Sequence, residues 1–376
     1  MINKIKLENF KCYRKVEFNL SSLTVFCGNN SVGKSTAIQS LAIVFQNKFK
    51  KELYLKGNLV DFSDVKDIFS RHAEVEDSHL RVSLDIDKVT YSWGVDDEKE
   101  QSLLRNKLVI KSDEVHNKIP ELYFNDKGFQ FLQAERFGPR VYLENNNDEL
   151  IINWLGSKGE YTFDVLAHVS NQLKRLSDED KRIFNNSEGT SIRRNIINWM
   201  SEISPGFNFQ SDTVTDVGIS HAQFSAYGSA NTKPIHMGFG LSYSLGIVCA
   251  LLLTQPGGLV IIENPEAHLH PRGQSYLGRL IARAALSGVQ VIIETHSDHL
   301  LNGIRVAAKL DNDYEDGEFK VFYVIGVPNS ESEVKDINIG CNGQLSEWPD
   351  GFFDQQAMDI KTLLKGEEAS SSRERI

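Results

Sequence analysis

No stretch of this 376-residue sequence reaches the roughly 18–20 uninterrupted apolar residues that a membrane-spanning helix needs. The longest candidate, residues 245–254, is much too short. The first ten residues alternate and carry charge, whereas a leader peptide is basic and then apolar, so we expect no export signal. The sequence therefore predicts a protein without a membrane segment.

Cysteine is also scarce, and acidic residues outnumber basic ones. None of the four cysteines pairs at the spacing of a zinc site, and they suggest no secreted disulfide framework, so we expect a reducing cytoplasm. The net charge of −10 argues against a surface coated for nucleic acid. Local basic clusters leave nucleic acid open as a ligand, although a solvated helix face is the simpler interpretation: Lys48, Lys50, Lys51, Lys56, Arg193 and Arg194.

The hydrophobic pattern predicts an α/β protein whose core is split between two separate parts of the sequence. Alternation over 2–20 indicates two strands, 23–26 a buried strand, and 34–47 a helix. The apolar runs 259–262 and 289–293 lie between helices, as parallel strands covered on both faces do. We divide the chain into a first half of the core, an inserted strand and helical region, a second half, a C-terminal element and a disordered tail: 1–50, 51–235, 236–340, 341–365 and 366–376.

Residues 28–36 match the phosphate-binding pattern GxxxxGK[ST] between an expected strand and an expected helix. Glycines and a helix N-terminus direct backbone N–H groups at phosphate oxygens. We expect Lys34 to reach the β- and γ-phosphates of ATP, Ser35 to bind Mg²⁺ and Thr36 to approach the α-phosphate. We also expect Lys34 to be a surface-loop charge that the fold does not need. The predicted ATP-binding set is Gly28, Asn29, Asn30, Ser31, Gly33, Lys34, Ser35 and Thr36.

Three further segments carry polar groups at the ends of expected elements. The apolar run 259–262 ends in Glu263, the arrangement that directs a carboxylate at the Mg²⁺ of a phosphate-binding loop, so Glu263 and Ser35 are the predicted metal ligands. The run 291–293 ends at a polar cluster in which Ser297 or Asp298 can cap a helix over 299–308. The glycine-rich turn 238–242 places Ser242 at an expected helix start, where it can bind phosphate or merely precede a core helix.

Together these segments resemble the SMC/RecF/OLD branch of ABC-type ATPases, and most closely a family of bacterial OLD-like predicted AAA ATPases with an uncharacterised C-terminal domain. The closest likeness is in 134–140, in the ENPEAHLHP segment 263–271 and in WPDGFFDQ, 348–355. The resemblance implies an ABC-type head with a mixed sheet flanked by helices. It also implies that His296 contacts the γ-phosphate and that Ser242 completes the nucleotide site of a second head, giving a homodimer or higher homo-oligomer. It further implies a place in bacterial anti-phage or mobile-element systems.

The sequence departs from the usual ABC-type pattern after Glu263. A catalytic glutamate ordinarily follows, but Asn264 stands there, and an amide can orient water without accepting its proton. Either Glu266 acts as the base or hydrolysis is slow. No nuclease pattern is apparent, so a nuclease effector would be a separate chain.

Three hypotheses follow from these residues. The first is an ATPase that acts with a separate effector protein, possessing catalytic residues Glu263, Asn264, Glu266 and His296. The second is an ATP-gated scaffold with little turnover that holds or silences such an effector. The third is a metallo-hydrolase that uses the dense set Glu266, His268, His270, His296 and His299, although residues two apart do not share a helix face.

Overall fold

The structure, a computed structural model, describes residues 1–74, 76–112, 123–124, 128–146, 153–184 and 189–365. At its centre is a six-stranded sheet in the order β15-β14-β3-β13-β12-β8. All neighbouring strands are parallel except β15, which pairs antiparallel with β14. The strands are β3 (Leu23–Gly28), β8 (Phe129–Leu132), β12 (Leu259–Glu263), β13 (Gln290–Glu294), β14 (Phe319–Ile325) and β15 (Glu333–Asn338).

Alternate residues of the central strands enter two different cores. Val260 and Ile262 join one core, whereas Leu259 and Ile261 of the same strand join the other. Successive side chains of a strand point to opposite faces, so a continuous apolar run predicts a strand covered on both sides. The first core lies among five helices: α4 (Thr162–Gln172), α5 (Ile192–Ile203), α6 (Phe239–Leu253), α7 (Pro271–Leu286) and α8 (Asp298–Leu310).

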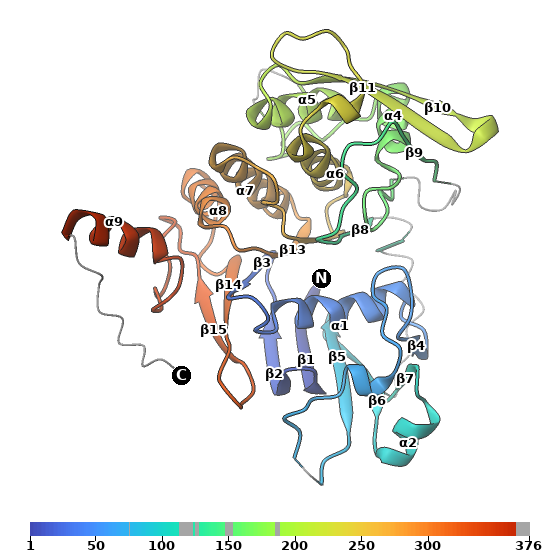
Figure 1. The fold of residues 1–376 in the computed structure, drawn as a ribbon, viewed down its shortest axis with the longest axis vertical. Helices are drawn as coiled ribbons and strands as arrows, with labels where there is room; N and C mark the ends of the chain where they lie inside the picture. Colours follow the sequence, from blue (N-terminus) through green and yellow to red (C-terminus); the bar gives the residue numbers. More distant parts are fainter. Residues whose placement is uncertain (75, 113–122, 125–127, 147–152, 185–188, 366–376) are drawn as a thin grey trace.

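The opposite face of the central sheet is covered by α1 (Lys34–Gln46) and an antiparallel sheet, below the central sheet in Figure 1. This second sheet has the order β2-β1-β5-β6-β7-β4. Its strands and the short helix beside them are β1 (Ile2–Phe10), β2 (Tyr13–Asn19), β4 (Glu52–Tyr54), β5 (Leu80–Ile86), β6 (Val89–Val95), α2 (Glu98–Leu103) and β7 (Lys107–Ile110).

A small third sheet lies beside α4, with the order β10-β11-β9. It contains β9 (Tyr142–Glu144), β10 (Asn208–Val214) and β11 (Ile219–Ser225). At the other end of the chain, α9 (Gln355–Lys365) follows the WPDGFFDQ segment and has no buried residue. No helix in the described part of the chain is long and apolar enough to cross a membrane.

The segment 51–235 is not set apart from the core as an insertion in space. Its strands β4 to β7 extend the sheet that β1 and β2 begin, and β8 occupies the edge of the central sheet beside β12. The free edges of β1 and β12 have backbone groups that need partners, and these strands supply them. The predicted boundaries stay predictions, and the predicted tail, 366–376, lies outside the described residues.

Candidate nucleotide site

The loop between β3 and α1 has the backbone that a phosphate cradle requires. Gly28 has a φ of 138° and Gly33, the N-cap of α1, a φ of 105°. A Cβ on Gly28 would lie 2.2 Å from the carbonyl oxygen of Val324, so both backbone conformation and space demand glycine at this position. Ser31 also adopts positive φ. The chain therefore curls tightly at the start of a helix, where unpaired N–H groups and the helix dipole favour an anion.

Lys34 is buried beneath this loop rather than being the surface-loop charge that we expected. Only 3% of it is exposed, because it is the first residue of α1 and points back across the loop. Its Nζ donates a hydrogen bond to the carbonyl oxygen of Asn29 at 2.6 Å and lies 3.8 Å from Oε1 of Glu294. Burial lowers the pKa of Lys34, and the nearby negative charge of Glu294 opposes this effect. The fold therefore depends on the Asn29 carbonyl and the Glu294 carboxylate, which compensate the buried charge of Lys34.

Glu294 is a site residue that the sequence analysis missed. It ends β13, which lies between the loop-bearing strand β3 and β12, and the register pairs it with Phe26 on one side and Glu263 on the other. It is 5% exposed, and its Oε2 has no hydrogen-bond partner among the described residues. A signal was present, since Glu294 ends an apolar run as Glu263 does, but strand order decides which carboxylate adjoins Lys34.

Glu263 ends β12, as predicted, but one strand further from the phosphate loop. Its Oε2 accepts a hydrogen bond from the backbone N–H of Ala134 at 2.9 Å. Burial raises the pKa of Glu263; the Ala134 N–H opposes this shift, and the neighbouring Glu294 charge adds to it. Two carboxylates in adjacent register at one sheet edge repel each other, an arrangement that a bound cation relieves.

After Glu263 the chain turns sharply and brings Glu266 to the end of β13. Asn264 adopts a φ of 44°, a left-handed conformation that asparagine tolerates better than most residues. Glu266 then accepts two hydrogen bonds, one from the hydroxyl of Thr295 and one from the backbone N–H of His296, each 2.8 Å long. The structure thus brings Glu266 and His296 together. Ser297 caps α8 by accepting from the N–H of Leu300, which confirms the capping interpretation.

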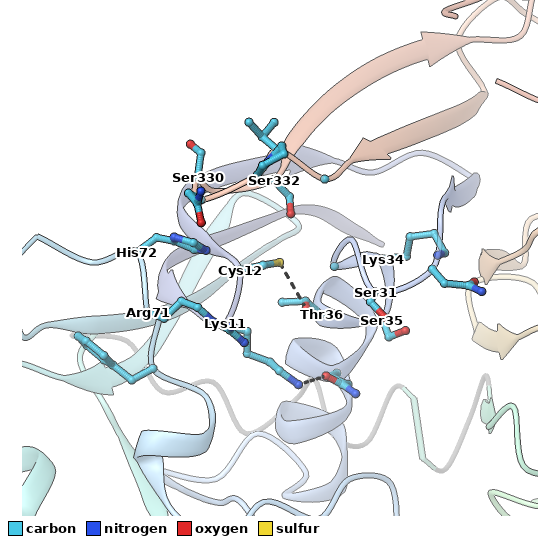
Figure 2. Close-up of a pocket in the computed structure, with 18 of the residues that line it drawn as sticks. Lys11, Cys12, Ser31, Lys34, Ser35, Thr36, Arg71, His72, Ser330 and Ser332 are labelled. Carbon is cyan, nitrogen blue, oxygen red and sulfur yellow. Dashed lines mark hydrogen bonds between the residues drawn. The ribbon is translucent and has the colours of Figure 1, made fainter. Parts of the chain in front are cut away.

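A cavity of about 1090 Å³ opens in front of the loop and is rich in cationic side chains. Figure 2 shows Lys11, Arg71 and His72 on the side of this cavity opposite Lys34. These three residues were not predicted as site residues, because no local motif marks them. The positive charges of Lys11 and Arg71 suit a polyanion such as a nucleoside triphosphate. The predicted residues that line the cavity are Asn30, Ser31, Gly33, Lys34, Ser35, Thr36 and His296.

A neighbouring cavity of about 330 Å³ joins the loop to the C-terminal element. Gly28, Asn29 and Asn30 line it with His296 and with residues 351–355 of the WPDGFFDQ segment. Phe352 anchors that segment, since it is fully buried and its ring centroid lies 5.1 Å from that of Tyr323 on β14. Glu263, Asn264, Glu266 and Ser242 line neither cavity.

The carboxylates and hydroxyl at this edge fit a magnesium ion that is shared with a nucleotide. Mg²⁺ usually takes one or two carboxylates together with phosphate oxygens and waters, rather than a cage made by protein alone. Glu294, whose Oε2 has no hydrogen-bond partner among the described residues, and the adjacent Glu263 would supply the carboxylates, and Ser35 on the first turn of α1 would supply a hydroxyl. No group of three or more His, Cys, Asp or Glu side chains in the described ranges is arranged to hold a metal ion. The histidine-rich metallo-hydrolase set is therefore not assembled.

The structure places Ser242 in the first turn of α6, and its role toward a nucleotide stays a prediction. The helix α6 begins at Phe239 with Gly238 as its N-cap, so Ser242 is the fourth helical residue and not the first. Its hydroxyl is enclosed and has no hydrogen-bond partner among the described residues. The residue as a whole is half-buried, whereas α6 buries every residue from Ser244 to Leu253. The groups at this helix start that remain available to a phosphate are the backbone N–H groups of residues 239–240.

Two protein families match separate parts of the chain. The model of a family described as "AAA domain, putative AbiEii toxin, Type IV TA system" matches residues 23–302. A second family, described as "Protein of unknown function (DUF3696)", matches 318–363, the region that contains the WPDGFFDQ segment. The chain is 21% identical over 349 residues to the Septu protein PtuA of Bacillus thuringiensis, covering 88% of this chain and 79% of that protein.

Solved structures of Smc head domains are similar to this fold. The head from Pyrococcus furiosus with an extended coiled coil, bound to the C-terminal domain of ScpA, has a TM-score of 0.56 at 15% identity, covering 96% of this chain and 99% of that one. The head from Pyrococcus yayanosii with a coiled coil and joint has a TM-score of 0.55 at 11% identity, covering 89% and 97%. At these identities the likeness shows the fold alone, and it confirms the predicted ABC-type head.

Proposed function

We propose that this chain, which belongs to the AAA-domain family whose model matches residues 23–302, is an ATPase that binds ATP with Mg²⁺ and hydrolyses it. The observation that carries the proposal is the buried Lys34 beside Glu294, beneath a glycine-turned loop that opens on a cationic cavity. A buried ammonium whose only hydrogen-bond partner among the described residues is a loop carbonyl is poised to exchange that partner for phosphate oxygens.

The proposed roles follow the placement of each side chain. Lys34 and the N–H groups of 29–36 hold the phosphates, and Lys11 and Arg71 complement the remaining negative charge. Ser35, Glu263 and Glu294 hold Mg²⁺, which when bound neutralises charge that develops on the phosphates. Glu266 accepts the proton of the attacking water, because a carboxylate that accepts two hydrogen bonds still has free lone pairs. Asn264 orients that water, and His296, which borders both cavities, faces the γ-phosphate.

We propose that two heads pair through the start of α6. A single head leaves the cavity open in front of its phosphate loop, and the exposed N–H groups at 239–240 of a second copy complement a triphosphate better than a diphosphate. ATP would then favour the closed pair and hydrolysis would reopen it. In this proposal the backbone N–H groups of residues 239–240, rather than the Ser242 hydroxyl, contact the nucleotide of the other head.

We also propose a cytoplasmic role in a bacterial defence system, with a separate effector protein. The family description and the similarity to Septu protein PtuA support this setting, and the OLD-like likeness of 134–140, 263–271 and 348–355 remains part of the proposal. Nucleic acid stays open as a further ligand.

A second candidate, an ATP-gated scaffold with little turnover, is favoured by one observation. Asn264 stands where the usual base is expected, and its backbone is held in a left-handed turn. Both candidates share the nucleotide site and differ only in hydrolysis.

The test combines a fluorescent ATP titration with steady-state phosphate release. We expect the parent to bind ATP and release phosphate in Mg²⁺, and Lys34→Met to lose tight binding. Lys66→Met removes an exposed charge of the same cavity and serves as the matched control, with at most a small effect. A parent that fails to bind ATP would refute the nucleotide site. Binding without phosphate release would favour the scaffold.

A further inference from the structure

We propose that Arg136 is a positioning residue of the hydrolysis site, whose guanidinium sets the place of the Glu263 and Glu266 carboxylates. Nothing in the sequence pattern assigns a role to this residue, and it does not line either cavity at the phosphate loop. The inference rests on the proposed function, because it concerns how that site is held.

The guanidinium of Arg136 bridges the main chain where β12 ends. Nη1 donates to the carbonyl oxygen of Glu263 at 2.6 Å, and Nη2 donates to that of Asn264 at 2.7 Å. A third bond joins Nη1 to the carbonyl oxygen of Gln133 at 2.7 Å. A strand that turns away from its sheet leaves its last carbonyls without ladder partners, and the planar fork of arginine satisfies two of them at a fixed spacing.

The same loop also holds the side chain of Glu263. The backbone N–H of Ala134 donates to the Glu263 carboxylate, and Arg136, two residues further along the chain, donates to the Glu263 carbonyl. The clamped residue Asn264 has the left-handed φ that turns the chain toward Glu266. Glu266 then reaches Thr295 and the N–H of His296. A displacement of the turn would therefore move both carboxylates relative to the phosphate loop.

Arg136 also connects this turn to the start of α6. It is 5% exposed, and its guanidinium carbon lies 5.2 Å from the ring centroid of Tyr243 on that helix. The Tyr243 ring in turn lies 4.8 Å from the ring of His268. The backbones pack closely as well, since a Cβ on Gly240 would lie 2.4 Å from the carbonyl oxygen of His268. The helix start proposed to meet a second head and the turn that carries the carboxylates thus share one packed unit centred on Arg136.

The test compares Arg136→Met and Arg136→Lys with the parent and with Arg140→Met. Arg140 is the matched control, because it lies in the same loop, is exposed and stacks on Phe137 without a hydrogen bond to β12. Three quantities are measured: ATP affinity in EDTA, the Mg²⁺ concentration that gives half-maximal tightening of ATP binding, and kcat for phosphate release. Circular dichroism and thermal unfolding establish that each variant is folded, and Arg136→Lys decides the matter if Arg136→Met does not fold.

We expect Arg136→Met to keep the ATP affinity of the parent in EDTA within about twofold. Residues that orient metal ligands are typically worth 10–100-fold in metal affinity or activity, so we expect the half-maximal Mg²⁺ concentration to rise and kcat to fall by about that factor. Arg136→Lys should be intermediate, because an ammonium cannot span two carbonyls as a fork. Arg140→Met should match the parent.

Folded Arg136 variants with the Mg²⁺ dependence and kcat of the parent would overturn the inference. So would an equal loss of ATP affinity with and without Mg²⁺, because a merely structural defect has no metal-dependent part. If the parent binds ATP but has no turnover, the proposed hydrolysis fails, and the Mg²⁺ dependence of ATP binding still decides the role of Arg136.

Discussion

The ion pair beneath the phosphate loop makes a quantitative prediction about the protein without nucleotide. The Lys34 and Glu294 side chains are 3% and 6% exposed, and Nζ and Oε1 lie 3.8 Å apart. Two unit charges at that separation attract by about 4 kcal/mol at an effective dielectric constant of 20. Removing one partner of a buried pair typically costs about 3–5 kcal/mol, because the other charge is left uncompensated.

We expect Lys34→Met to lower the free energy of unfolding by about 2–4 kcal/mol, somewhat less than the typical cost of removing one partner of a buried pair. The cost is reduced because Lys34 also donates a hydrogen bond to the Asn29 carbonyl, so Glu294 is not its only stabilising contact. The distance from Nζ to Oε1 of Glu294 is also long for a direct hydrogen bond. Glu294→Gln should cost less, since Lys34 keeps the Asn29 carbonyl and the repulsion between Glu294 and Glu263 is lost. The double variant should be less destabilised than the sum of the single variants by about 1–3 kcal/mol.

Urea unfolding of the four proteins without nucleotide measures this coupling as a double-mutant cycle. Lys66→Met is the control for the loss of one positive charge from the same cavity, and it should unfold at the urea concentration of the parent. Sites that do not interact add to within about 0.3–0.5 kcal/mol. A coupling below that value would refute the ion pair, and with it the view that a buried Lys34 is held in readiness for phosphate.

Three further predictions concern the neighbouring residues. Because burial raises the pKa of Glu263 above its ordinary 4.5, the folded protein binds that proton more readily than the unfolded chain, and stability is gained as pH falls through the raised pKa. Glu263→Gln should therefore raise the Tm of the nucleotide-free protein above that of the parent at neutral pH, and this difference in Tm should disappear near pH 4.5. A difference in Tm that does not change with pH would contradict this prediction. Glu266→Gln should lower kcat by about 10²–10⁴-fold with ATP affinity retained, and a parental rate would place the proton acceptor elsewhere. Gly238→Arg, whose Cβ meets no atom within 4 Å, should fold and abolish ATP-promoted association in light scattering, whereas Ser242→Ala should leave it intact; the reverse pattern would return the role to the hydroxyl.

The phosphate loop and the elements beside it could be predicted because their determinants are local. Gly28, Gly33 and Lys34 are close in sequence, and the strand before them and the helix after them show their periodicities within short windows. The continuous apolar runs of β12 and β13 likewise predict strands covered on both faces, which the two cores confirm. These features predict an α/β core with a phosphate-binding loop, and the resemblance of the motif segments to a known family implied the ABC-type head.

Which side chains meet at the site depended on how distant strands are ordered. The sequence marks Glu263 and Glu294 equally, as acids that end apolar runs, but only the order β3-β13-β12 places Glu294 beside Lys34 and Glu263 one strand away. The same packing buries Lys34, which the sequence presents as a loop charge. Position along a chain does not determine exposure, because the residues that cover a side chain come from other elements.

Ser242 and Arg136 show, for single side chains, the same difference between what the sequence predicts and what the tertiary structure decides. The sequence determined that a glycine-rich turn precedes a helix near 240. The tertiary structure decided that the helix begins at Phe239 and that the Ser242 hydroxyl is enclosed. Arg136 lies in the family-like segment 134–140, but nothing in that segment indicates its contacts. Its three carbonyl partners lie at the end of β12 and in its own loop. The phosphate loop and the strands and helices beside it depend on residues that are close in sequence, so the sequence itself determined them. Contacts between elements more than 100 residues apart depend on the relative placement of whole strands and helices, and only the tertiary structure decided them.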